Sequence, residues 1–150
     1  MISIVCPFYN EESIIEKSIH LMMENLKSLS DDWELIIVDD GSTDSSLKLA
    51  QSLEKDYPKM SVTGYSVNRG RGFALRTGVA KAVGDLVVTT EIDSSWGDDI
   101  VHKIIAEFSN KKDADIIIAS PHLPGGKYKN VPLTRALLSS IGNLIIRAGT

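Results

Sequence analysis

The sequence contains little cysteine and no excess of positive charge. Cys6 is the single cysteine among 150 residues, which excludes an internal disulfide and fits a reducing compartment such as the cytoplasm. Sixteen Lys and Arg residues face twenty Asp and Glu residues, giving a net charge of −4. Because a mildly acidic chain has no bulk electrostatic attraction for nucleic acid, we expect no nucleic-acid partner.

Long hydrophobic runs are absent as well. The longest, such as residues 86–88 and 116–119, have only a few residues, far fewer than the about 20 that cross a bilayer. No basic region followed by an apolar stretch opens the chain, so no signal peptide is expected. Hydrophobic residues at 43% and charged residues at 24% are typical of a globular domain. The length suits one domain over residues 1–150.

Short β-branched runs alternate with segments of helical periodicity. Strands are predicted at residues 2–5, 35–38, 61–67, 86–90 and 116–119. Helices are predicted from Glu11 to Leu29, from an N-cap at Asp44 to a stop at Pro58, and over residues 72–83 and 98–108. This rhythm is typical of βαβ units, and unbroken Val, Ile and Leu runs are typical of parallel strands covered on both faces. The sequence therefore predicts an α/β fold, a mostly parallel sheet with helices on both faces.

Polar and turn-forming residues follow each of the first four predicted strands, at residues 7–11, 39–44, 68–72 and 91–93. Right-handed crossovers place the carboxyl ends of parallel strands along one edge of the sheet. Ligands of open α/β sheets bind at that edge. Loops are polar in any protein, but four loops rich in carboxylates, aromatics and arginines favour a binding site over that simpler interpretation.

Glu91 and Asp93 are two residues apart after the fourth predicted strand. In an extended segment they face one point, while Ile92 faces the opposite side. Two converging carboxylates repel each other unless a cation lies between them or one is protonated. Mg²⁺ and Mn²⁺ are typically held by one or two carboxylates together with substrate phosphates. The pair therefore predicts a divalent metal site, and a solvated turn is the alternative.

Two other loops carry candidate ligand contacts. Asp39 and Asp40 follow the second predicted strand, where a carboxylate can accept hydrogen bonds from a base or a ribose. A simple turn is the alternative, and Asp44 is interpreted as a helix cap.

Arg69 and Arg71 lie at a predicted helix start among Gly70 and Gly72, with Arg76 further along the chain. This arrangement suits a diphosphate. A solvated charged loop is the alternative there. Leu75 stands where a dinucleotide fingerprint needs its third glycine, and no phosphate-binding lysine motif of the Walker A type occurs.

Other reactive side chains form no recognisable catalytic set. His20, His102 and His122 lack zinc-type spacing, and His20 and His102 are interpreted as helix residues without a catalytic role. Cys6 lies in an apolar strand and is expected in the core. Ser94 and Ser95 have no histidine partner by motif, so a hydrolase triad is not supported.

Four short motifs occur in order along the chain: Pro7-x-Tyr9-Asn10-Glu11, Val38-Asp39-Asp40-Gly41-Ser42-x-Asp44, Asn68-x-Gly70-x-Gly72 and Glu91-x-Asp93. In this order and spacing they resemble glycosyltransferase family 2, whose members have the GT-A fold. The later segment Asn130-x-Pro132-Leu133-x-Arg135, then Ser139-x-x-x-Asn143, resembles the subset that transfers sugars to polyprenyl phosphates. The resemblance covers residues 2–147.

The resemblance implies a role for each matching residue. It implies that the nucleotide-sugar site contains Pro7, Tyr9, Glu11, Val38, Asp40, Glu91 and Asp93, with Val38 and Asp40 at the base and ribose. Arg69 and Arg71, expected at the diphosphate, and Ile92 complete the expected nucleotide-sugar site. Glu91 and Asp93 occupy the acid-x-acid metal motif for Mg²⁺ or Mn²⁺, and Asp93 is also a catalytic candidate. Arg135, the second catalytic candidate, would lie near the phosphate of a lipid acceptor. A lipid phosphate is already ionised and needs no strong general base, so direct attack would invert the sugar's anomeric centre.

The chain departs from the family pattern in three places. Glu91 stands where the motif usually begins with Asp, and Ala119-Ser120-Pro121-His122 stands where relatives often carry Gly-Ser-Arg-Tyr. His122, Lys127 or Lys129 would have to replace the missing arginine. Relatives also continue past residue 150 with further basic residues and a membrane-facing helix, so the chain is expected to lack those C-terminal segments.

Three expectations remain open on sequence alone. An amphipathic helix over residues 133–146 could lie at a membrane interface, which would place the protein at the cytoplasmic face of a membrane, or it could pack on another part of the protein. A nucleotidyltransferase is an alternative function, although residues 7–10 do not resemble its glycine-rich loop. A non-catalytic nucleotide-binding module derived from a transferase is the other.

Overall fold

The computed structural model describes residues 1–29, 32–93 and 96–120, and every helix and strand below lies in that part. Residues Met1–Ile118 form one compact unit, and Ala119–Thr150 form a second. Only Ala119 and Ser120 of the second unit are described, so the expected helix over residues 133–146 lies outside the described residues. One domain over residues 1–150 stays a prediction.

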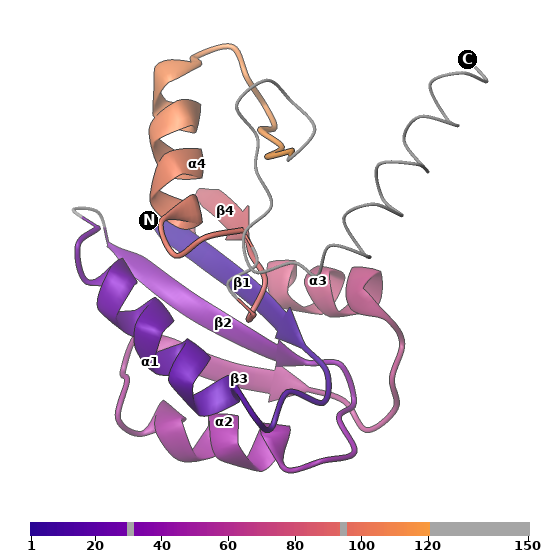
Figure 1. The fold of residues 1–150 in the computed structure, drawn as a ribbon. Coiled ribbons are helices and arrows are strands. Elements are labelled where there is room, and N and C mark those ends of the chain that lie inside the picture. Colours follow the sequence, from indigo (N-terminus) through magenta and orange to yellow (C-terminus); the bar gives the residue numbers. More distant parts are fainter. Residues whose placement is uncertain (30–31, 94–95, 121–150) are drawn as a thin grey trace, which may run out of the picture. The chain divides into compact units, whose positions relative to one another are not determined.

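The described residues form four strands that alternate with four helices, as Figure 1 shows. In chain order they are β1 (Ile2–Phe8), α1 (Ile15–Leu26), β2 (Trp33–Asp39), α2 (Ser46–Glu54), β3 (Met60–Gly64), α3 (Arg71–Val79), β4 (Leu86–Thr89) and α4 (Ile100–Asn110). The predicted alternation of strands and helices is confirmed. In the described part of the chain, no helix is long and apolar enough to cross a membrane.

All strand pairs are parallel, and the strand order is β3-β2-β1-β4. β1 pairs with β2 along its whole length, from Ile2 beside Trp33 to Phe8 beside Asp39. After β3 the chain returns to the other side of β1, where β4 pairs in register with its first half. The direction of winding therefore reverses between β1 and β4. This is the position at which open α/β sheets bind ligands.

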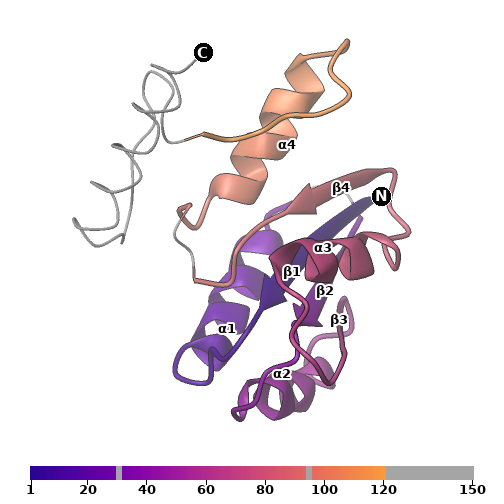
Figure 2. The ribbon, with the colours of Figure 1, turned by 90° about the vertical axis from the view of Figure 1, so that its right-hand side faces the viewer.

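Alternate residues of the two central strands face opposite layers of helices, which explains their continuous apolar sequence. Ile4, Cys6, Leu35 and Ile37 pack with buried residues of α1, α2 and α4, whereas Val5, Ile36 and Val38 pack with Ala74 of α3. Figure 2 shows α1 and α2 on one face of the sheet and α3 on the other. Both faces are thus covered, as the unbroken Val and Ile runs predict.

Glycine allows α3 to lie close to the sheet. A Cβ atom added at Gly78 would lie 2.3 Å from Val5 Cγ1 and 2.9 Å from Val38 Cγ2. No real side chain fits at those distances, so the helix can approach β1 and β2 this closely only with glycine at this position. This contact fixes the height of α3 above the sheet and, with it, the place where the N-terminus of α3 meets the carboxyl edge.

The predicted fifth strand at residues 116–119 is wrong. Within the described residues, the sheet has four strands, and residues 115–120 belong to no element. Ile116 and Ile118 are 78% and 79% exposed, unlike the buried isoleucines of β1 and β2. Three consecutive isoleucines have a high strand propensity, but a strand also needs a neighbour for its backbone hydrogen bonds. In the described residues none pairs with this segment.

Several predicted boundaries are wrong because loops take up chain that the periodicity assigned to elements. Helix α1 begins at Ile15 rather than at Glu11, whose carbonyl closes a turn by accepting from the N–H groups of Ile14 and Ile15. β3 ends at Gly64 because the next residues turn toward Asp40, as described below. Helix α2 ends at Glu54, before Pro58, and α3 ends at Val79 rather than at residue 83.

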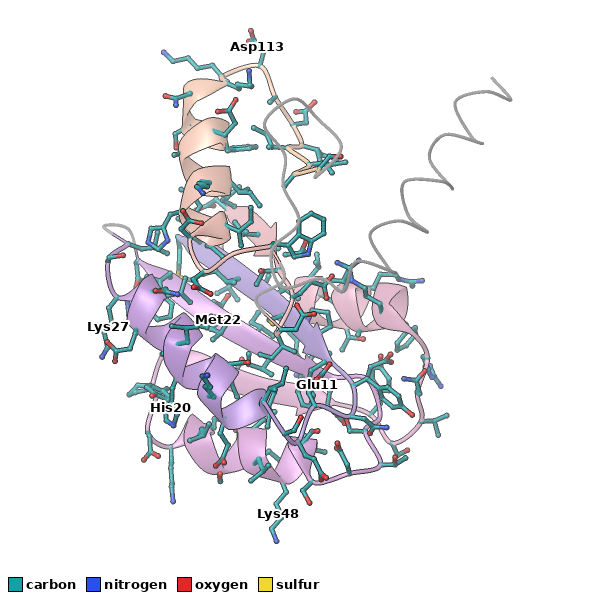
Figure 3. The ribbon with its side chains drawn as sticks, in the orientation of Figure 1. Glu11, His20, Met22, Lys27, Lys48 and Asp113 are labelled. Carbon is teal, nitrogen blue, oxygen red and sulfur yellow. The ribbon has the colours of Figure 1, made fainter. Side chains whose placement is uncertain are left out.

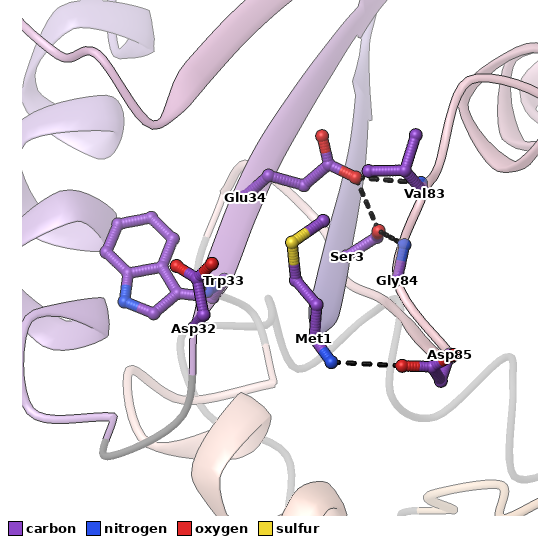
Figure 4. A network of polar contacts seen from close by, with 8 residues as sticks. All are labelled: Met1, Ser3, Asp32, Trp33, Glu34, Val83, Gly84 and Asp85. Atoms are coloured by element: carbon purple, nitrogen blue, oxygen red, sulfur yellow. Dashed lines mark hydrogen bonds and ion pairs between the residues drawn. The ribbon is translucent and has the colours of Figure 1, made fainter.

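A polar cluster closes the amino edge of the sheet, and Figure 4 shows it. Ser3 Oγ donates to Glu34 Oε1 at 2.6 Å, and the backbone N–H of Val83 donates to the same oxygen at 2.9 Å. The N–H of Gly84 donates to Ser3 Oγ, and the N-terminal ammonium pairs with Asp85. These contacts hold the connection from α3 to β4 against the starts of β1 and β2.

Candidate active site

A cleft opens at the carboxyl ends of β1 and β4, where the winding of the sheet reverses. Counted with the solvent space at its mouth, it has a volume of about 520 Å³, and it is lined by Pro7, Phe8, Tyr9, Glu11, Asp40, Arg71, Glu91, Ile92 and Asp93. These residues come from four loops that lie far apart in the sequence. The prediction that polar strand-end residues gather at one edge is therefore confirmed.

The loops after β1 and β2 are joined by reciprocal hydrogen bonds. Asn10 has a left-handed backbone with φ 54°, its N–H donates to Ser42 Oγ, and its side-chain oxygen accepts from the N–H of Thr43. The N–H of Glu12 donates to Asp44, and the carboxylate of Glu12 accepts from the N–H of Ser45. These bonds fix the loop that carries Tyr9 and Glu11; Figure 3 shows Glu11 in the loop that follows β1.

Asp44 acts at the start of α2, as the cap interpretation predicts. Its Oδ1 accepts from the N–H of Ser46, the first residue of the helix, at 3.0 Å. The N-cap position itself belongs to Ser45, one residue later than predicted. Ser46 Oγ also accepts from the N–H of Glu11 at 2.7 Å, which joins the start of α2 to the loop after β1.

Asp40 is the centre of a buried polar network. Its side chain is 4% exposed. Oδ1 accepts from the Tyr65 hydroxyl at 2.5 Å and from the N–H of Arg69 at 3.0 Å, while Oδ2 accepts from the Asn68 amide at 3.0 Å. An ionised carboxylate oxygen can accept two hydrogen bonds. Among the described residues Oδ2 accepts only one, so it has the capacity to accept a second.

Gly41 brings this network together. Its φ is +72°, and a Cβ atom there would lie 2.5 Å from the Asn68 nitrogen and from the Val67 carbonyl carbon. Only glycine permits both this backbone conformation and this approach. The loop after β2 can therefore press directly against residues 67–69, which places Asn68 and Arg69 within reach of Asp40.

Glu91 is paired with Arg71 across the cleft. Arg71 Nε lies 2.7 Å and Nη2 lies 2.6 Å from Glu91 Oε1. The Arg71 side chain is 57% exposed and the Glu91 side chain 27% exposed. A predicted diphosphate-binding arginine and a predicted metal ligand are therefore in direct contact, which the sequence did not indicate.

Burial and neighbouring carboxylates raise the pKa values of Glu11 and Cys6. Burial, together with the charges of Asp93 and Asp44, raises the pKa of Glu11. Burial, with Glu91 and Asp93 nearby, also raises the pKa of the Cys6 thiol, which is fully buried and therefore inert, as expected for a core residue. In the described part of the cleft Arg71 is the only cationic side chain. The cleft thus suits a ligand that brings positive charge with it.

The start of α3 is open toward the cleft. Gly70 has φ +86°, and a Cβ atom added at Gly70 or Gly72 would meet nothing within 4 Å. The α3 N-terminus, which follows Gly70, presents backbone N–H groups, and helix N-termini attract anions. Space, backbone donors and the Arg71 guanidinium therefore occur together at this end of the cleft.

Two predicted ligand contacts lie elsewhere. Arg69 does not line the cleft; its guanidinium stacks 4.7 Å from the centre of the Phe73 ring. Val38 is fully buried between the sheet and α3 and does not line the cleft either. Arg135, and with it Pro121, His122, Lys127 and Lys129, lies outside the described residues. The other eight nucleotide-site residues line the cleft, and their contact with a ligand stays a prediction.

Sequence reasoning missed Tyr65 and Phe73. The Tyr65 ring meets Phe73 edge-on, with centroids 5.1 Å apart, and its hydroxyl donates to Asp40. Burial and that hydrogen bond raise the pKa of Tyr65, so the phenol stays protonated as a donor. Tyr65 lies within the strand predicted at residues 61–67, whereas β3 ends at Gly64, so its position in a loop near Asp40 was missed.

A second cavity lies beside the cleft, and Glu91 lines both. Its lining comes from α1, from the start of α4 and from the loop between β4 and α4, including Trp96, which is 42% exposed. His102 contacts Ser28 at 2.8 Å, and His20 contacts the Tyr57 hydroxyl. Both histidines lie in helices, as predicted, and their lack of a catalytic role stays a prediction.

The acidic pair suits a divalent cation that also binds a ligand. Among residues 1–29, 32–93 and 96–120, no three His, Cys, Asp or Glu side chains converge closely enough to hold an ion alone. Mg²⁺ retains several waters and relies on one or two carboxylates plus substrate phosphates. Glu91 and Asp93 line the same cleft and supply hard oxygen donors of the kind that Mg²⁺ and Mn²⁺ prefer. The donor chemistry therefore fits such an ion in the presence of a diphosphate.

Comparison with known proteins shows which family the sequence matches. The family model described as "Glycosyl transferase family 2" matches residues 3–147. A dolichyl-phosphate beta-glucosyltransferase of Trichomonas vaginalis is 30% identical over 99% of this chain and 48% of its own length. A dolichol-phosphate mannosyltransferase of Pyrococcus furiosus is 31% identical over 92% of this chain and 38% of its own length. The chain thus spans less than half the length of these two relatives.

Solved structures have the same fold. A mannosyltransferase of Pyrobaculum calidifontis, in complex with GDP-Man and Mn²⁺, superposes with a TM-score of 0.63 at 22% identity, covering 80% of this chain and 36% of that one. A glucosyl-3-phosphoglycerate synthase of Mycobacterium tuberculosis, in complex with Mn²⁺, UDP and phosphoglyceric acid, has a TM-score of 0.56 at 29% identity, covering 72% of this chain and 38% of that one. The expected GT-A fold is confirmed. The chain belongs to glycosyltransferase family 2.

Proposed function

We propose that this member of glycosyltransferase family 2 transfers a sugar from a nucleoside diphosphate sugar to a polyprenyl phosphate. The observation that carries the proposal is the meeting of Asp40, Arg71, Glu91 and Asp93 in one cleft at the reversal point of the sheet. These side chains come from three separate segments of the chain. Asp40 supplies a hydrogen-bond acceptor for the nucleoside, Arg71 a cation for the diphosphate, and Glu91 and Asp93 carboxylates for a metal. Two relatives named for transfer to dolichyl or dolichol phosphate support the acceptor class.

Asp40 binds the nucleoside in this proposal. Tyr65, Asn68 and the Arg69 backbone already orient its carboxylate. One acceptor position of Oδ2 remains for an N–H of the base or a hydroxyl of the ribose. Because the carboxylate is held before the ligand arrives, the hydrogen bond costs little ordering entropy. Pro7 and Tyr9 line the same cleft as Asp40 and provide apolar surface.

Asp93 and Glu91 hold the divalent metal in this proposal, with Asp93 as the principal ligand. When bound, Mg²⁺ or Mn²⁺ acts as a Lewis acid that stabilises negative charge on the departing diphosphate. Arg71 and the backbone N–H groups at the start of α3 would bind the same diphosphate and stabilise its negative charge. Arg135 would bind the acceptor phosphate.

The acceptor phosphate attacks the sugar directly in this proposal. A phosphate oxygen is already ionised at neutral pH, so this chain needs no strong general base to remove a proton. Attack from the face opposite the diphosphate forms the new bond as the old one breaks, and the anomeric centre inverts. We place the reaction at the cytoplasmic face of a membrane, because the acceptor is a lipid and Cys6 is a free thiol.

A non-catalytic nucleotide-binding module is the second candidate. One observation favours it: Glu91, which departs from the family's usual aspartate, is engaged by Arg71 instead of standing ready for a metal. Turnover distinguishes the two candidates, because a binding module would bind the nucleotide sugar without consuming it.

The deciding experiment combines binding with turnover. The chain is melted with GDP- and UDP-sugars in the presence of Mn²⁺ or Mg²⁺, and the preferred sugar nucleotide is then incubated with a short polyprenyl phosphate. A ligand at 100 times its Kd adds about 2.7 kcal/mol to the free energy of unfolding. We expect a metal-dependent rise in Tm for one nucleotide class and formation of the lipid-linked sugar. A rise without turnover would favour the binding module, and no rise with any sugar nucleotide would exclude both.

A further inference from the structure

Arg71 and Glu91 form a charge pair that engages one ligand oxygen. Arg71 Nε donates to Glu91 Oε1 at 2.7 Å, and Nη2 lies 2.6 Å from the same atom. A charge-assisted hydrogen bond of this kind holds the oxygen toward the guanidinium and neutralises the charge of the carboxylate. While Arg71 stays in place, an ion at Glu91 therefore has to bind beside a positive charge.

The charge balance of the cleft gives this pair its role. Four carboxylates line the described part of the cleft, those of Glu11, Asp40, Glu91 and Asp93, against the single guanidinium of Arg71. Arg71 thus occupies the electrostatic position that a divalent cation takes when it binds. Its side chain is 57% exposed, so more than half of its surface is in contact with solvent rather than held by packing.

We propose that Arg71 is a place-holder for the metal. Arg71 pairs with Glu91 until a metal and a diphosphate enter together, and it then leaves Glu91 and binds the diphosphate. The inference rests on the proposed function and deepens it by stating how that site orders its ligands. Binding of the diphosphate draws Arg71 from Glu91, and the released carboxylate turns to the metal. No covalent bond forms or breaks in this exchange.

The exchange makes metal and nucleotide binding depend on each other. Without a diphosphate, a metal that uses Glu91 must either break its pair with Arg71 or bind beside the guanidinium charge, so its affinity is low. With a diphosphate present, Arg71 has already left Glu91 to bind the diphosphate, so the metal gains Glu91 without breaking that pair. Such coupling is reciprocal, because each ligand must raise the affinity of the other by the same factor.

Electron paramagnetic resonance of Mn²⁺ tests the inference through binding alone. The 150-residue chain and the variants Arg71→Gln, Glu91→Gln and Arg71→Gln/Glu91→Gln are titrated with Mn²⁺, with and without GDP or UDP. Arg76→Gln is the matched control. Arg76 lies over the Phe73 ring and does not line the cleft, so its substitution removes the same charge outside the cleft. Thermal melts of each variant establish that it is folded.

We expect Arg71→Gln to bind Mn²⁺ at least threefold more tightly than wild type when no nucleotide is present. The factor by which GDP or UDP raises Mn²⁺ affinity should fall in that variant. The gain should vanish on the Glu91→Gln background, because the pair is the target of the substitution. Arg76→Gln should stay within twofold of wild type.

Unchanged or weaker nucleotide-free Mn²⁺ binding by Arg71→Gln would overturn the inference, as would an equal gain in Arg76→Gln. A gain that persists on the Glu91→Gln background would overturn it too. The wild-type arm separates this failure from failure of the proposed function. If wild type binds neither GDP nor UDP with Mn²⁺, the proposed function falls and the exchange falls with it.

Discussion

The two edges of the sheet each place a glutamate at the centre of a polar cluster, but the two glutamates meet different partners. At the amino edge, Glu34 accepts from neutral donors, the Ser3 hydroxyl and the Val83 N–H. At the carboxyl edge, Glu91 is held by the charged Arg71 in a cleft lined by three further carboxylates. Both edges are polar, yet only one concentrates charge.

Hydrogen-bond satisfaction does not distinguish the edges. Among the described residues, no buried side-chain nitrogen or oxygen lacks a partner. The difference lies in charge: Asp93 and Asp44, together with burial, raise the pKa of Glu11 at the carboxyl edge, whereas the N-terminal ammonium lowers the pKa of Asp85 at the amino edge. The amino edge is therefore complete within its own chain, while the carboxyl edge is balanced only when a cation joins it.

Removing a single charge from the carboxyl edge should have the largest effect on ligand binding. Asp93→Asn should abolish the metal-dependent part of nucleotide affinity while leaving the fold intact, because Asp93 is an exposed loop residue. Isothermal titration of nucleotide with Mn²⁺, and again with chelator, measures that part. Glu91→Gln should do less damage. A full metal-dependent increment in Asp93→Asn would remove Asp93 as the ligand.

Glycine-to-alanine changes at the two edges should separate folding from binding. Gly41→Ala should cost about 3 kcal/mol of unfolding free energy, because it adds left-handed strain and a clash with the backbone of residues 67–68. It should also weaken nucleotide binding, since it displaces the residues that orient Asp40. Urea denaturation and nucleotide titration measure the two effects.

Gly84→Ala is the counterpart at the amino edge, where a Cβ atom would lie 2.7 Å from the Met1 carbonyl oxygen and from the Ser3 nitrogen. We expect a loss of about 1–3 kcal/mol from overpacking, with nucleotide affinity unchanged in the folded fraction. Equal effects of both glycine variants on nucleotide affinity would show that the edges are not independent.

Asp40→Ala should weaken nucleotide binding by about 1–3 kcal/mol, the range for a hydrogen bond to a charged group. It should also lower stability, because Tyr65, Asn68 and the Arg69 N–H lose their acceptor. Tyr65→Phe controls for this second effect, since it removes one donor and keeps the carboxylate. If Asp40→Ala binds the preferred nucleotide as tightly as wild type, Asp40 is purely structural.

Glu11→Gln should have the smallest effect and the clearest pH dependence. Because the pKa of Glu11 is raised above its usual 4.5 in the folded protein, the ionised side chain costs stability above that pH. The variant should therefore be more stable than wild type near pH 7, by less than about 1 kcal/mol. The gain should vanish below about pH 4.5, where the folded and unfolded states are both protonated. Thermal melts across pH measure it; a gain that persists in acid would assign it to another cause.

The same comparison shows what sequence reasoning could reach. The two-sided burial of Ile36 and Val38 against Leu35 and Ile37 follows from an unbroken apolar run. Their positions directly after predicted parallel strands placed Asp40, Glu91 and Asp93 at one edge, and all three line the cleft. Such inferences succeed because they depend on spacings of two to four residues, which the local geometry of strands and helices converts directly into faces.

The parallel α/β sheet, the edge that carries the cleft and most of the residues that line it could thus be predicted from the amino-acid order. The packing of distant segments brings Arg71 to Glu91, Tyr65 to Asp40 and Arg69 to Phe73. It also leaves residues 116–119 outside any strand in the described part of the chain. The two charge contacts join residues 20 and 25 positions apart. Their formation depends on how closely Gly41 and Gly78 let neighbouring segments approach, which no local periodicity encodes.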